Sequence, residues 1–281
     1  MSQIRVQKHT ARYWTATFDN GPINLMNPAT VYELDQLLTS LETDPEVRVI
    51  VFDSANPDFF IAHWDVTTPG AVVAGMKTES GTRRGMHPHA DVQTRLGRLP
   101  VVTIAAIRGR ARGAGSEFAL ACDIRFASRE RAVFGQFEVG VGAVAGGGST
   151  AHLPRLLGRG RAFEALLGGD DFPAELAERY GWINRALPDA ELDTFVDAFA
   201  RRIAGYEKEV IVEIKELVNR ATLPPDEEFL AALKAFFAST TRPGPGRARL
   251  QALLESGLQQ DGEVERHLGA HVALKSAEKK G

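Results

Sequence analysis

The hydrophobic pattern at the start of the chain predicts two strands and a helix. Apolar and polar residues alternate over residues 3–9 and 12–18, which predicts a hairpin that ends at the Asn20-Gly21-Pro22 break. Apolar residues then recur at helical spacing between Asn27-Pro28 and Asp44-Pro45. Asn27 has the chemistry of a helix N-cap and Pro28 suits the first turn, so this segment is predicted to be an amphipathic helix.

The rest of the chain predicts buried strands followed by helices. Residues 47–53 and 101–107 are continuous apolar runs bounded by helix breakers, which is typical of strands buried on both faces. Their alternation with helices favours parallel pairing and an α/β fold. Residues 66–90 are rich in glycine, proline and threonine and are expected to form a long mobile loop. After residue 150 the pattern becomes helical, and from 201 only helices are expected.

Composition excludes several classes of protein. The chain has 281 residues, 44% of them hydrophobic and 25% charged, which fits a folded globular protein. The net charge of −3 gives no overall basic field for nucleic acid. The single cysteine, Cys122, excludes an intrachain disulfide and a cysteine-based zinc site, and is expected to be buried and inert. The N-terminus has no apolar signal region, and no apolar stretch is long enough to span a membrane, so a cytoplasmic protein is expected.

A glycine-rich turn follows the strand at 101–107 and leads into an apolar helix that begins near Glu117. The first N–H groups of a helix have no partner within it and carry a partial positive charge. Because Gly113, Ala114 and Gly115 have almost no side chain, a ligand oxygen could approach these N–H groups, as in one half of an oxyanion hole. The alternative is that the small residues only allow the helix to pack closely.

A second junction follows the strand at 47–53. Residues 58–66 contain Ala62 directly before His63-Trp64-Asp65, and the Ala62 N–H could supply the other half of the oxyanion hole. This small residue alone is a weak signal.

Glu138 lies between apolar residues and precedes a loop with five glycines. Two glutamates in apolar, glycine-lined surroundings suit acid–base chemistry, because desolvation and mutual repulsion would hold one proton between Glu117 and Glu138. The alternative is two independent glutamates that are solvated or paired with arginines such as Arg125 and Arg129.

Taken together, these segments resemble the crotonase superfamily, also called the enoyl-CoA hydratase/isomerase family, from about residue 12 to residue 200. The resemblance rests on four ordered segments: ATFDNGPINLMNPATVYELDQLL, DPEVRVIVFDSANPDFFIAHWDV, LPVVTIAAIRGRARGAGSEFALACDIRFAS and FGQFEVGVGAVAGGGSTAHLPRLLG. It implies an α/β fold, a crotonase-like spiral of β-β-α turns over residues 1–200. A C-terminal helical region over 201–281 is expected to mediate a homotrimer or a hexamer.

The resemblance also assigns roles to residues. The backbone N–H groups of Ala62 and Ala114 would hold a thioester oxygen, and Glu117 and Glu138 would be the acid–base pair. The substrate would also contact residues 62–65 and Gly113. The presence of both glutamates favours an enoyl-CoA hydratase that acts on a coenzyme A thioester, with no metal and no cofactor. An isomerase, an acyl-CoA hydrolase, a C–C bond lyase and a catalytically silent binding protein remain alternatives.

Several residues depart from the family pattern. His63-Trp64 replaces small residues and could narrow the acyl pocket. Arg108, Arg110 and Arg112 are unusual and are expected to face solvent or phosphate groups. The pair in His87-Pro88-His89 is expected to belong to a loop, because no third metal ligand lies nearby in the sequence.

Overall fold

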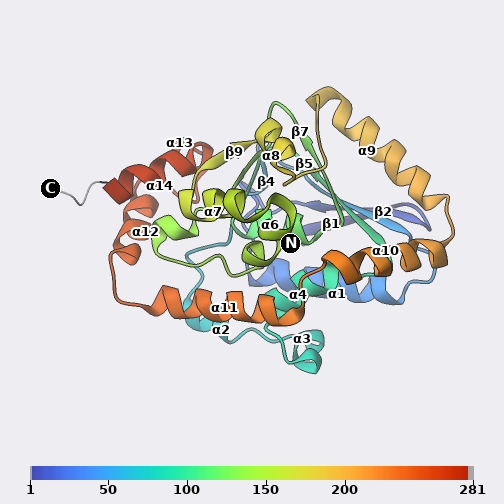
Figure 1. Ribbon diagram of the computed structural model, residues 1–281, viewed down its shortest axis with the longest axis horizontal. Coiled ribbons are helices and arrows are strands. Elements are labelled where there is room, and N and C mark those ends of the chain that lie inside the picture. Colours follow the sequence, from blue (N-terminus) through green and yellow to red (C-terminus); the bar gives the residue numbers. More distant parts are fainter. Residues whose placement is uncertain (1, 278–281) are drawn as a thin grey trace.

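Two β-sheets form the centre of the molecule (Figure 1). The computed structural model describes residues 2–277 of the chain. In spatial order, the six-stranded sheet contains β1 (Ile4–Thr10), β2 (Tyr13–Phe18), β3 (Val49–Ser54), β5 (Val102–Ile107), β7 (Ile124–Ser128) and β10 (Arg185–Leu187). The four-stranded sheet contains β4 (Phe59–Ile61), β6 (Arg110–Arg112), β8 (Val133–Gly135) and β9 (Asp171–Pro173). The outer pairs β1–β2 and β8–β9 are antiparallel, and all other neighbours are parallel.

The chain winds as a spiral of β-β-α turns. Three successive strand pairs, β3–β4, β5–β6 and β7–β8, each place one strand in each sheet before the chain continues into helices. The helices of these turns are α2 (Gly70–Ala74), α3 (Glu79–Arg84), α4 (Pro88–Leu96), α5 (Ala114–Ala121), the 3-10 turn η1 (Glu138–Val141), α6 (Ser149–Leu157) and α7 (Arg159–Gly168). This arrangement confirms the predicted α/β spiral.

The N-terminal predictions agree with the structure. β1 and β2 pair antiparallel with Ile4 opposite Phe18, which is the predicted hairpin. The helix α1 (Pro28–Thr43) begins with a capping box, in which the Asn27 side chain accepts from the Thr30 N–H and the Thr30 hydroxyl accepts from the Asn27 N–H. Its buried residues lie on one face, as the helical spacing indicated.

The prediction of a long loop over residues 66–90 is wrong. This segment contains α2, α3 and the start of α4. All nine residues of α4 are buried, the polar and charged ones included, so the helix has no solvent-exposed face. A surface helix is recognised in a sequence by apolar residues on one face and polar residues on the other. A helix that is buried on all sides lacks this amphipathic pattern. Its polar residues are tolerated because they have partners within the protein.

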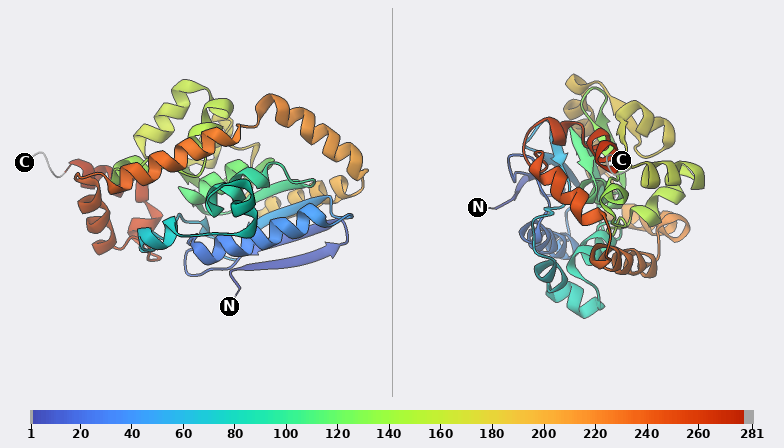
Figure 2. Two further views of the ribbon diagram at one scale, coloured as in Figure 1. Left: turned by 90° about the horizontal axis from the view of Figure 1, so that it is seen from below. Right: turned by 90° about the vertical axis from the view of Figure 1, so that its left-hand side faces the viewer.

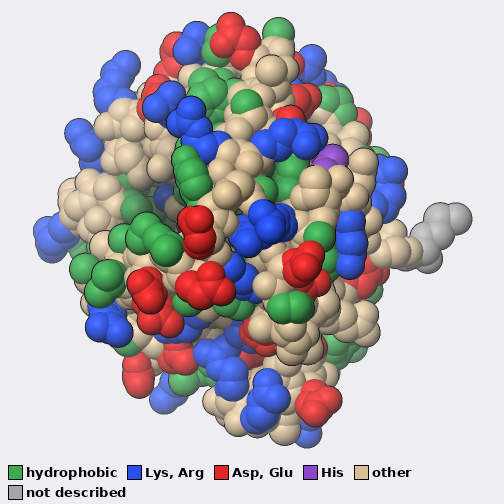
Figure 3. Space-filling view, turned by 90° about the vertical axis from the view of Figure 1, so that its right-hand side faces the viewer, with side chains coloured by type: hydrophobic (Ala, Val, Ile, Leu, Met, Phe, Trp, Pro, Cys, Tyr) green, Lys and Arg blue, Asp and Glu red, His purple; other side chains and the backbone are tan. Residues whose placement is uncertain are grey.

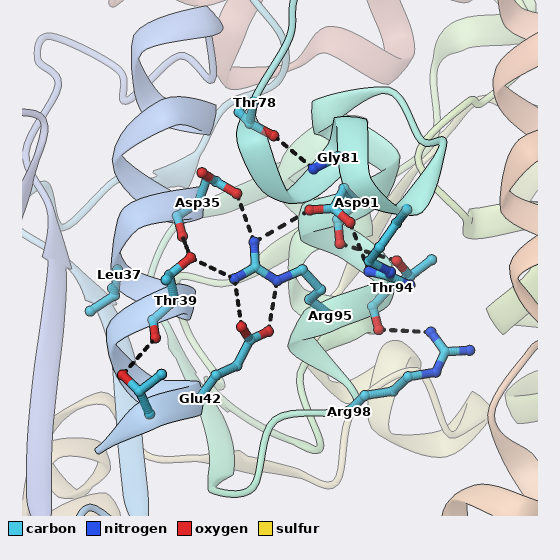
Figure 4. Close-up of polar contacts among 12 residues, drawn as sticks. Asp35, Leu37, Thr39, Glu42, Thr78, Gly81, Asp91, Thr94, Arg95 and Arg98 are labelled. Atoms are coloured by element: carbon cyan, nitrogen blue, oxygen red, sulfur yellow. Dashed lines mark hydrogen bonds and ion pairs between the residues drawn. The ribbon is translucent and has the colours of Figure 1, made fainter.

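A charged network joins α4 to α1 (Figure 4). The Arg95 guanidinium donates to both carboxylate oxygens of Glu42, at 2.7 and 3.0 Å, and to Asp35 at 2.7 Å. It also donates to the Thr39 hydroxyl at 2.9 Å and to Asp91 at 3.3 Å. Since Arg95 and Asp91 are buried, these bonds compensate for their desolvation and fix α4 against α1.

Helices make up most of the chain after β9, as predicted. They are α8 (Ala174–Tyr180), α9 (Asp189–Ala204), α10 (Lys208–Thr222), α11 (Asp226–Thr241), α12 (Gly246–Glu255), α13 (Glu263–Arg266) and α14 (Leu268–Ala277). Helices α12 to α14 gather at one end of the molecule and α10 lies at the other (Figure 2). Helix α11 runs between them and packs on α4.

The three arginines of β6 and its preceding turn bind protein groups. Arg112 is fully buried and makes a bidentate ion pair with Asp171, at 2.6 and 2.7 Å. Its remaining nitrogen Nη1 donates to the backbone oxygen of Glu265 in α13 at 2.6 Å. Arg108 pairs with Asp189 in α9 at 2.9 Å. The expectation that these arginines face solvent or phosphate is therefore wrong for Arg108 and Arg112, which join β6 and its preceding turn to elements far along the chain.

The surface is mixed in charge. On the face shown in Figure 3, acidic and basic side chains are interspersed, and neither sign forms a continuous field. Within residues 2–277, no helix combines the length and the apolarity needed to cross a bilayer. Cys122 is buried, and burial raises the pKa of its thiol, which fits the predicted inert state.

Candidate active site

A cavity of about 540 Å³ lies where α5, η1, α4 and the C-terminal helices meet. Its lining includes seven of the eight residues that the sequence nominated for the site: His63, Trp64, Asp65, Gly113, Ala114, Glu117 and Glu138. Phe236 and Phe237 of α11 and the Arg242–Arg249 segment complete the wall from the far end of the chain.

A close backbone contact brings the two predicted junctions together. A Cβ atom on Gly115, in the first turn of α5, would lie 2.1 Å from the Ile61 backbone oxygen at the end of β4. Only glycine fits there, so the start of α5 packs directly against the turn that begins at Ala62. The small residues at the start of α5 therefore serve close packing, and this packing places Ala114 beside the turn at Ala62.

Glu117 lies in the first turn of α5 and faces the N-terminus of α6. Its Oε1 accepts from the Gly147 N–H at 2.7 Å, from the Ser149 hydroxyl at 3.0 Å and from the Ser149 N–H at 3.4 Å. The positive end of the α6 dipole adds to these donors. These contacts stabilise the ionised carboxylate, and they involve only Oε1.

Glycines allow both carboxylates to approach the backbone. A Cβ atom on Gly147 would lie 2.2 Å from Glu117 Oε2, and one on Gly113 would lie 2.8 Å from Glu138 Oε1. Gly113 also has a φ of 47°, in the left-handed region that glycine adopts without strain. The glycines in the two motifs thus make room for the acidic side chains.

Gln136 connects the two glutamates. With its amide nitrogen oriented toward Glu138, Gln136 donates to Glu138 Oε2 at 3.1 Å and to the Ser149 hydroxyl oxygen at 3.2 Å. Ser149 in turn contacts Glu117. Gln136 and Ser149 are both buried, and sequence reasoning missed them. The only signal was their position beside the second glutamate and the GGGS turn.

The two carboxyl groups have raised proton affinities. Burial and the neighbouring Glu117 raise the pKa of Glu138 from its ordinary 4.5 to about 8. Burial also raises the pKa of Glu117, and the hydrogen bonds from Gly147 and Ser149 oppose that shift. Because Glu117 has the stronger donors for an ionised carboxylate, it is the member of the pair that loses its proton first. The site therefore stabilises the charged form of Glu117 better than that of Glu138.

The two predicted oxyanion amides differ in their surroundings. Ala114 lines the cavity, and its N–H belongs to the first turn of α5, where backbone donors have no partner within the helix. The Ala62 N–H instead donates to the Ile23 backbone oxygen at 3.3 Å, and Ala62 packs in a separate apolar cluster away from the cavity wall. The structure thus brings Ala114 to the cavity but leaves the Ala62 amide engaged elsewhere.

His63 and Trp64 leave the cavity open. The His63 ring is fully buried and points to the C-terminal region, where its Nε2 lies 2.8 Å from Glu265 Oε1. Trp64 is half-buried in the wall, and Asp65 Oδ1 accepts from the Gln259 side chain at 2.9 Å. The bulky pair therefore lines the pocket without filling it.

His87 and His89 lie on the wall as well, which the sequence did not indicate. Pro88 begins α4 and His87 is its N-cap, so the expectation of a loop is wrong. His87 Nε2 lies 2.7 Å from the Val73 backbone oxygen, while the His89 ring packs edge-on against Trp64 with the ring centroids 5.4 Å apart. Burial lowers the pKa of His89 to about 4, so its ring is neutral.

The alternative of salt-bridged glutamates is also wrong. Arg125 donates to the backbone oxygens of Trp182 at 2.8 Å and Cys122 at 2.7 Å. Arg129 pairs with Glu175 at 3.9 Å. Neither arginine contacts the glutamates of the cavity.

Comparison with known proteins gives a consistent result. The family model for enoyl-CoA hydratase/isomerase matches residues 14–258. A short-chain-enoyl-CoA hydratase from Clostridium acetobutylicum is 33% identical over 198 residues, which cover 70% of this chain and 74% of that protein. The crystal structure of a candidate enoyl-CoA hydratase from Streptomyces avermitilis is 42% identical, with a TM-score of 0.89 and 96% of each chain covered. An enoyl-CoA hydratase/isomerase structure from Xanthobacter autotrophicus Py2 is 25% identical, with a TM-score of 0.78 over 100% of this chain and 99% of that one.

Proposed function

Because the chain belongs to the enoyl-CoA hydratase/isomerase family, we propose that it adds water across the 2,3 double bond of an enoyl-CoA thioester. The observation that carries this proposal is the pair of glutamates, Glu117 and Glu138, in one cavity with different stabilisation of their charges. Hydration needs both a base for water and an acid for carbon, and the pair can supply one of each.

The thioester oxygen would bind at the start of α5. The Ala114 N–H is the first donor, and the dipole of α5 adds to it. The Ala62 N–H becomes the second donor if it exchanges its 3.3 Å bond to Ile23 for the substrate oxygen. That bond is longer than is typical for N–H donors, so the exchange gives up a weak interaction. A fixed donor of this kind contributes about 3 kcal/mol to the stability of the transition state.

The chemical step would use the two carboxyl groups in sequence. Ionised Glu117 takes a proton from water as the water oxygen bonds to Cβ, and the π electrons move onto the thioester oxygen to form an enolate. Protonated Glu138 then gives its proton to Cα, and the carbonyl re-forms. Each proton transfer to a positioned group contributes about 10²- to 10⁴-fold in rate. Glu117 ends the turnover protonated and Glu138 ionised, so a proton must return to Glu138 before the next turnover.

The coenzyme A part of the substrate would need cationic groups. Arg242, Arg247 and Arg249 border the cavity, and Arg242 and Arg247 are exposed. Guanidinium groups suit phosphate oxygens in charge and in geometry. We assign these arginines to the coenzyme A phosphates, and this assignment needs no metal or redox cofactor.

Hydration of crotonyl-CoA and longer 2-enoyl-CoA esters by the purified chain tests the function. The loss of the conjugated double bond reports the reaction. Glu117→Gln and Glu138→Gln should each reduce kcat by at least about 100-fold. If both variants hydrate as fast as the parent, the assignment fails. If only Glu138→Gln loses activity and the parent shifts the double bond instead, the chain is an isomerase.

A homotrimer, or a hexamer built from two trimers, is the assembly that we propose. It is supported by an apolar row on α10, where Val210, Ile214, Leu217 and Val218 are about half exposed or more. Such a row is typical of surfaces that pack against a partner. Light scattering in solution tests the assembly, and a monomer would contradict it.

A further inference from the structure

His89 differs from its neighbour His87 in one respect that concerns ligands. Both ring nitrogens of His87 have partners, the Val73 backbone oxygen and the His89 N–H. By contrast, neither ring nitrogen of His89 has a hydrogen-bond partner within residues 2–277, although the residue is only 8% exposed. Buried polar groups normally have partners, so an unpaired one on a cavity wall indicates that a ligand or water completes it.

The free nitrogen of His89 lies beside the free oxygen of Glu117. The position that a Cβ on Gly147 would occupy is 2.7 Å from His89 Nε2 and 2.2 Å from Glu117 Oε2. The two atoms therefore lie close to each other on the same side of the Gly147 backbone. The hydrogen bonds from Gly147 and Ser149 reach only Oε1 of Glu117, which leaves Oε2 for the substrate side.

We propose that His89 and Glu117 together hold the oxygen that is added to Cβ, first as water and then as the β-hydroxyl of the product. This inference rests on the proposed hydratase function and adds a third side chain to the site. A neutral imidazole carries one donor and one acceptor. Water and hydroxyl groups also both donate and accept, so the match holds for either tautomer of His89.

The ring is held in place by α4 and Trp64. Helix α4 is anchored to α1 by the Arg95 network (Figure 4), and it is buried along its whole length. Trp64 packs edge-on against the His89 ring. If the residue at position 89 only filled space, an apolar side chain would serve better. It would pack there without the cost of desolvating a polar nitrogen.

The test is a comparison of two ligands that differ by one oxygen. Calorimetry measures the affinity of 3-hydroxybutyryl-CoA, as both enantiomers, and of butyryl-CoA. A Glu138→Gln background slows turnover by at least about 100-fold and leaves Glu117 and His89 in place. We expect the better-bound enantiomer to bind more tightly than butyryl-CoA. His89→Leu should reduce that preference about fivefold, which corresponds to one neutral hydrogen bond, and should leave butyryl-CoA affinity within twofold.

Two further variants separate a specific contact from a structural effect. His89→Gln retains a donor and an acceptor on a side chain of similar reach and should keep most of the preference. His9→Asn, at an exposed histidine of β1 that does not line the cavity, is the control and should leave the preference unchanged. Circular dichroism and thermal unfolding should be measured for each variant to check that it is folded.

The outcomes distinguish this inference from the proposed function. An unchanged preference in His89→Leu, or equal binding of the two ligands by the parent, overturns the role of His89, while hydration by the wild-type chain still supports the function. If the chain binds neither ester and hydrates none, both fail. If His89→Leu loses affinity for butyryl-CoA to the same extent, the residue has a packing role and the inference is wrong.

Discussion

The His63 imidazole lies 2.8 Å from the Glu265 carboxylate, and both side chains are fully buried. These residues are 202 positions apart in the sequence. His63 belongs to the turn that follows β4, and Glu265 belongs to α13. Glu265 Oε1 also accepts from the Gln259 N–H at 2.6 Å, and the Gln259 side chain contacts Asp65 and Val66. The C-terminal helices thus support the turn that lines the cavity.

Replacement of Glu265 with alanine should destabilise the protein strongly. Burial acts to raise the pKa of Glu265, but His63 and the Gln259 N–H lower it below its ordinary value, so the carboxylate is ionised in the folded state. Removing it leaves His63 buried without its partner. We expect a loss of about 3–5 kcal/mol in the free energy of unfolding, measured by urea denaturation.

Glu263→Ala is the matched control for this change. Glu263 lies on the same short helix with 77% of its side chain exposed, and within residues 2–277 its ion pairing is limited to a long contact of 3.8 Å with His267. Its replacement should alter the free energy of unfolding by less than about 0.5 kcal/mol. A similar small effect in Glu265→Ala would show that the His63–Glu265 pair does not secure the turn.

Gly147→Ala should abolish hydration while leaving most of the fold intact. The new methyl group would lie 2.2 Å from Glu117 Oε2 and 2.7 Å from His89 Nε2, so at least one of these side chains must move. We expect kcat to fall at least about 100-fold, because the base leaves its position. Steady-state kinetics with crotonyl-CoA measures the change.

Gly160→Ala provides the comparison for Gly147→Ala. Gly160 lies in α7, and a Cβ atom there has no heavy atom within 4 Å. Alanine at this position should stabilise the helix by about 0.5–1 kcal/mol and leave kcat unchanged. Full activity in Gly147→Ala would mean that Glu117 is not held as the structure shows.

The elements with local signals could be predicted from the sequence. Asn27-Pro28 marks the start of α1 through capping chemistry, and continuous apolar runs mark β3 and β5. The glutamates could be nominated because glycines surround them in the sequence. Their meeting in one cavity could not be derived from either segment alone, since it depends on contacts between α5 and the start of α6.

Features that depend on distant partners could not be predicted. Helix α4 was missed because its charged residues find partners on α1, which removes the amphipathic pattern. His89 could not be assigned to the site from the sequence, because its distinguishing feature is structural. Its ring nitrogens have no hydrogen-bond partner within residues 2–277. The bond from the Ala62 N–H to the Ile23 backbone oxygen depends on the conformation of the turn before α1. The sequence around Ala62 does not indicate that conformation.

Arg95→Met should destabilise the protein and displace α4. The substitution removes the bonds to Glu42, Asp35 and Thr39, and it leaves the buried Asp91 with Arg84 as its remaining ion-pair partner. We expect a loss of about 3–5 kcal/mol in urea unfolding. Replacement of the exposed Arg83 of α3 with methionine is the control and should change stability by less than about 0.5 kcal/mol. Equal stabilities of the two variants would contradict the role of the network.

Through Glu138, stability should fall as the pH rises toward 8, and activity should fall above a pH of about 8. Its pKa is about 8 in the folded state and near its ordinary 4.5 in the unfolded chain, because burial and Glu117 act only in the folded state. Between these two values the folded chain keeps a proton that the unfolded chain has lost. The free energy of unfolding therefore decreases with rising pH across this window, by at most about 1.4 kcal/mol per pH unit for this group.

Glu138→Gln isolates this contribution, because an amide does not titrate. Urea unfolding at intervals between pH 5 and about 8.5 should show a steeper decline for the wild-type chain than for Glu138→Gln. Hydration by the wild-type chain should fall above a pH of about 8, as the acid that protonates Cα ionises. Parallel stability profiles would show that Glu138 is already ionised in the folded protein, and the ionised base and the protonated acid would then need to be assigned to other groups.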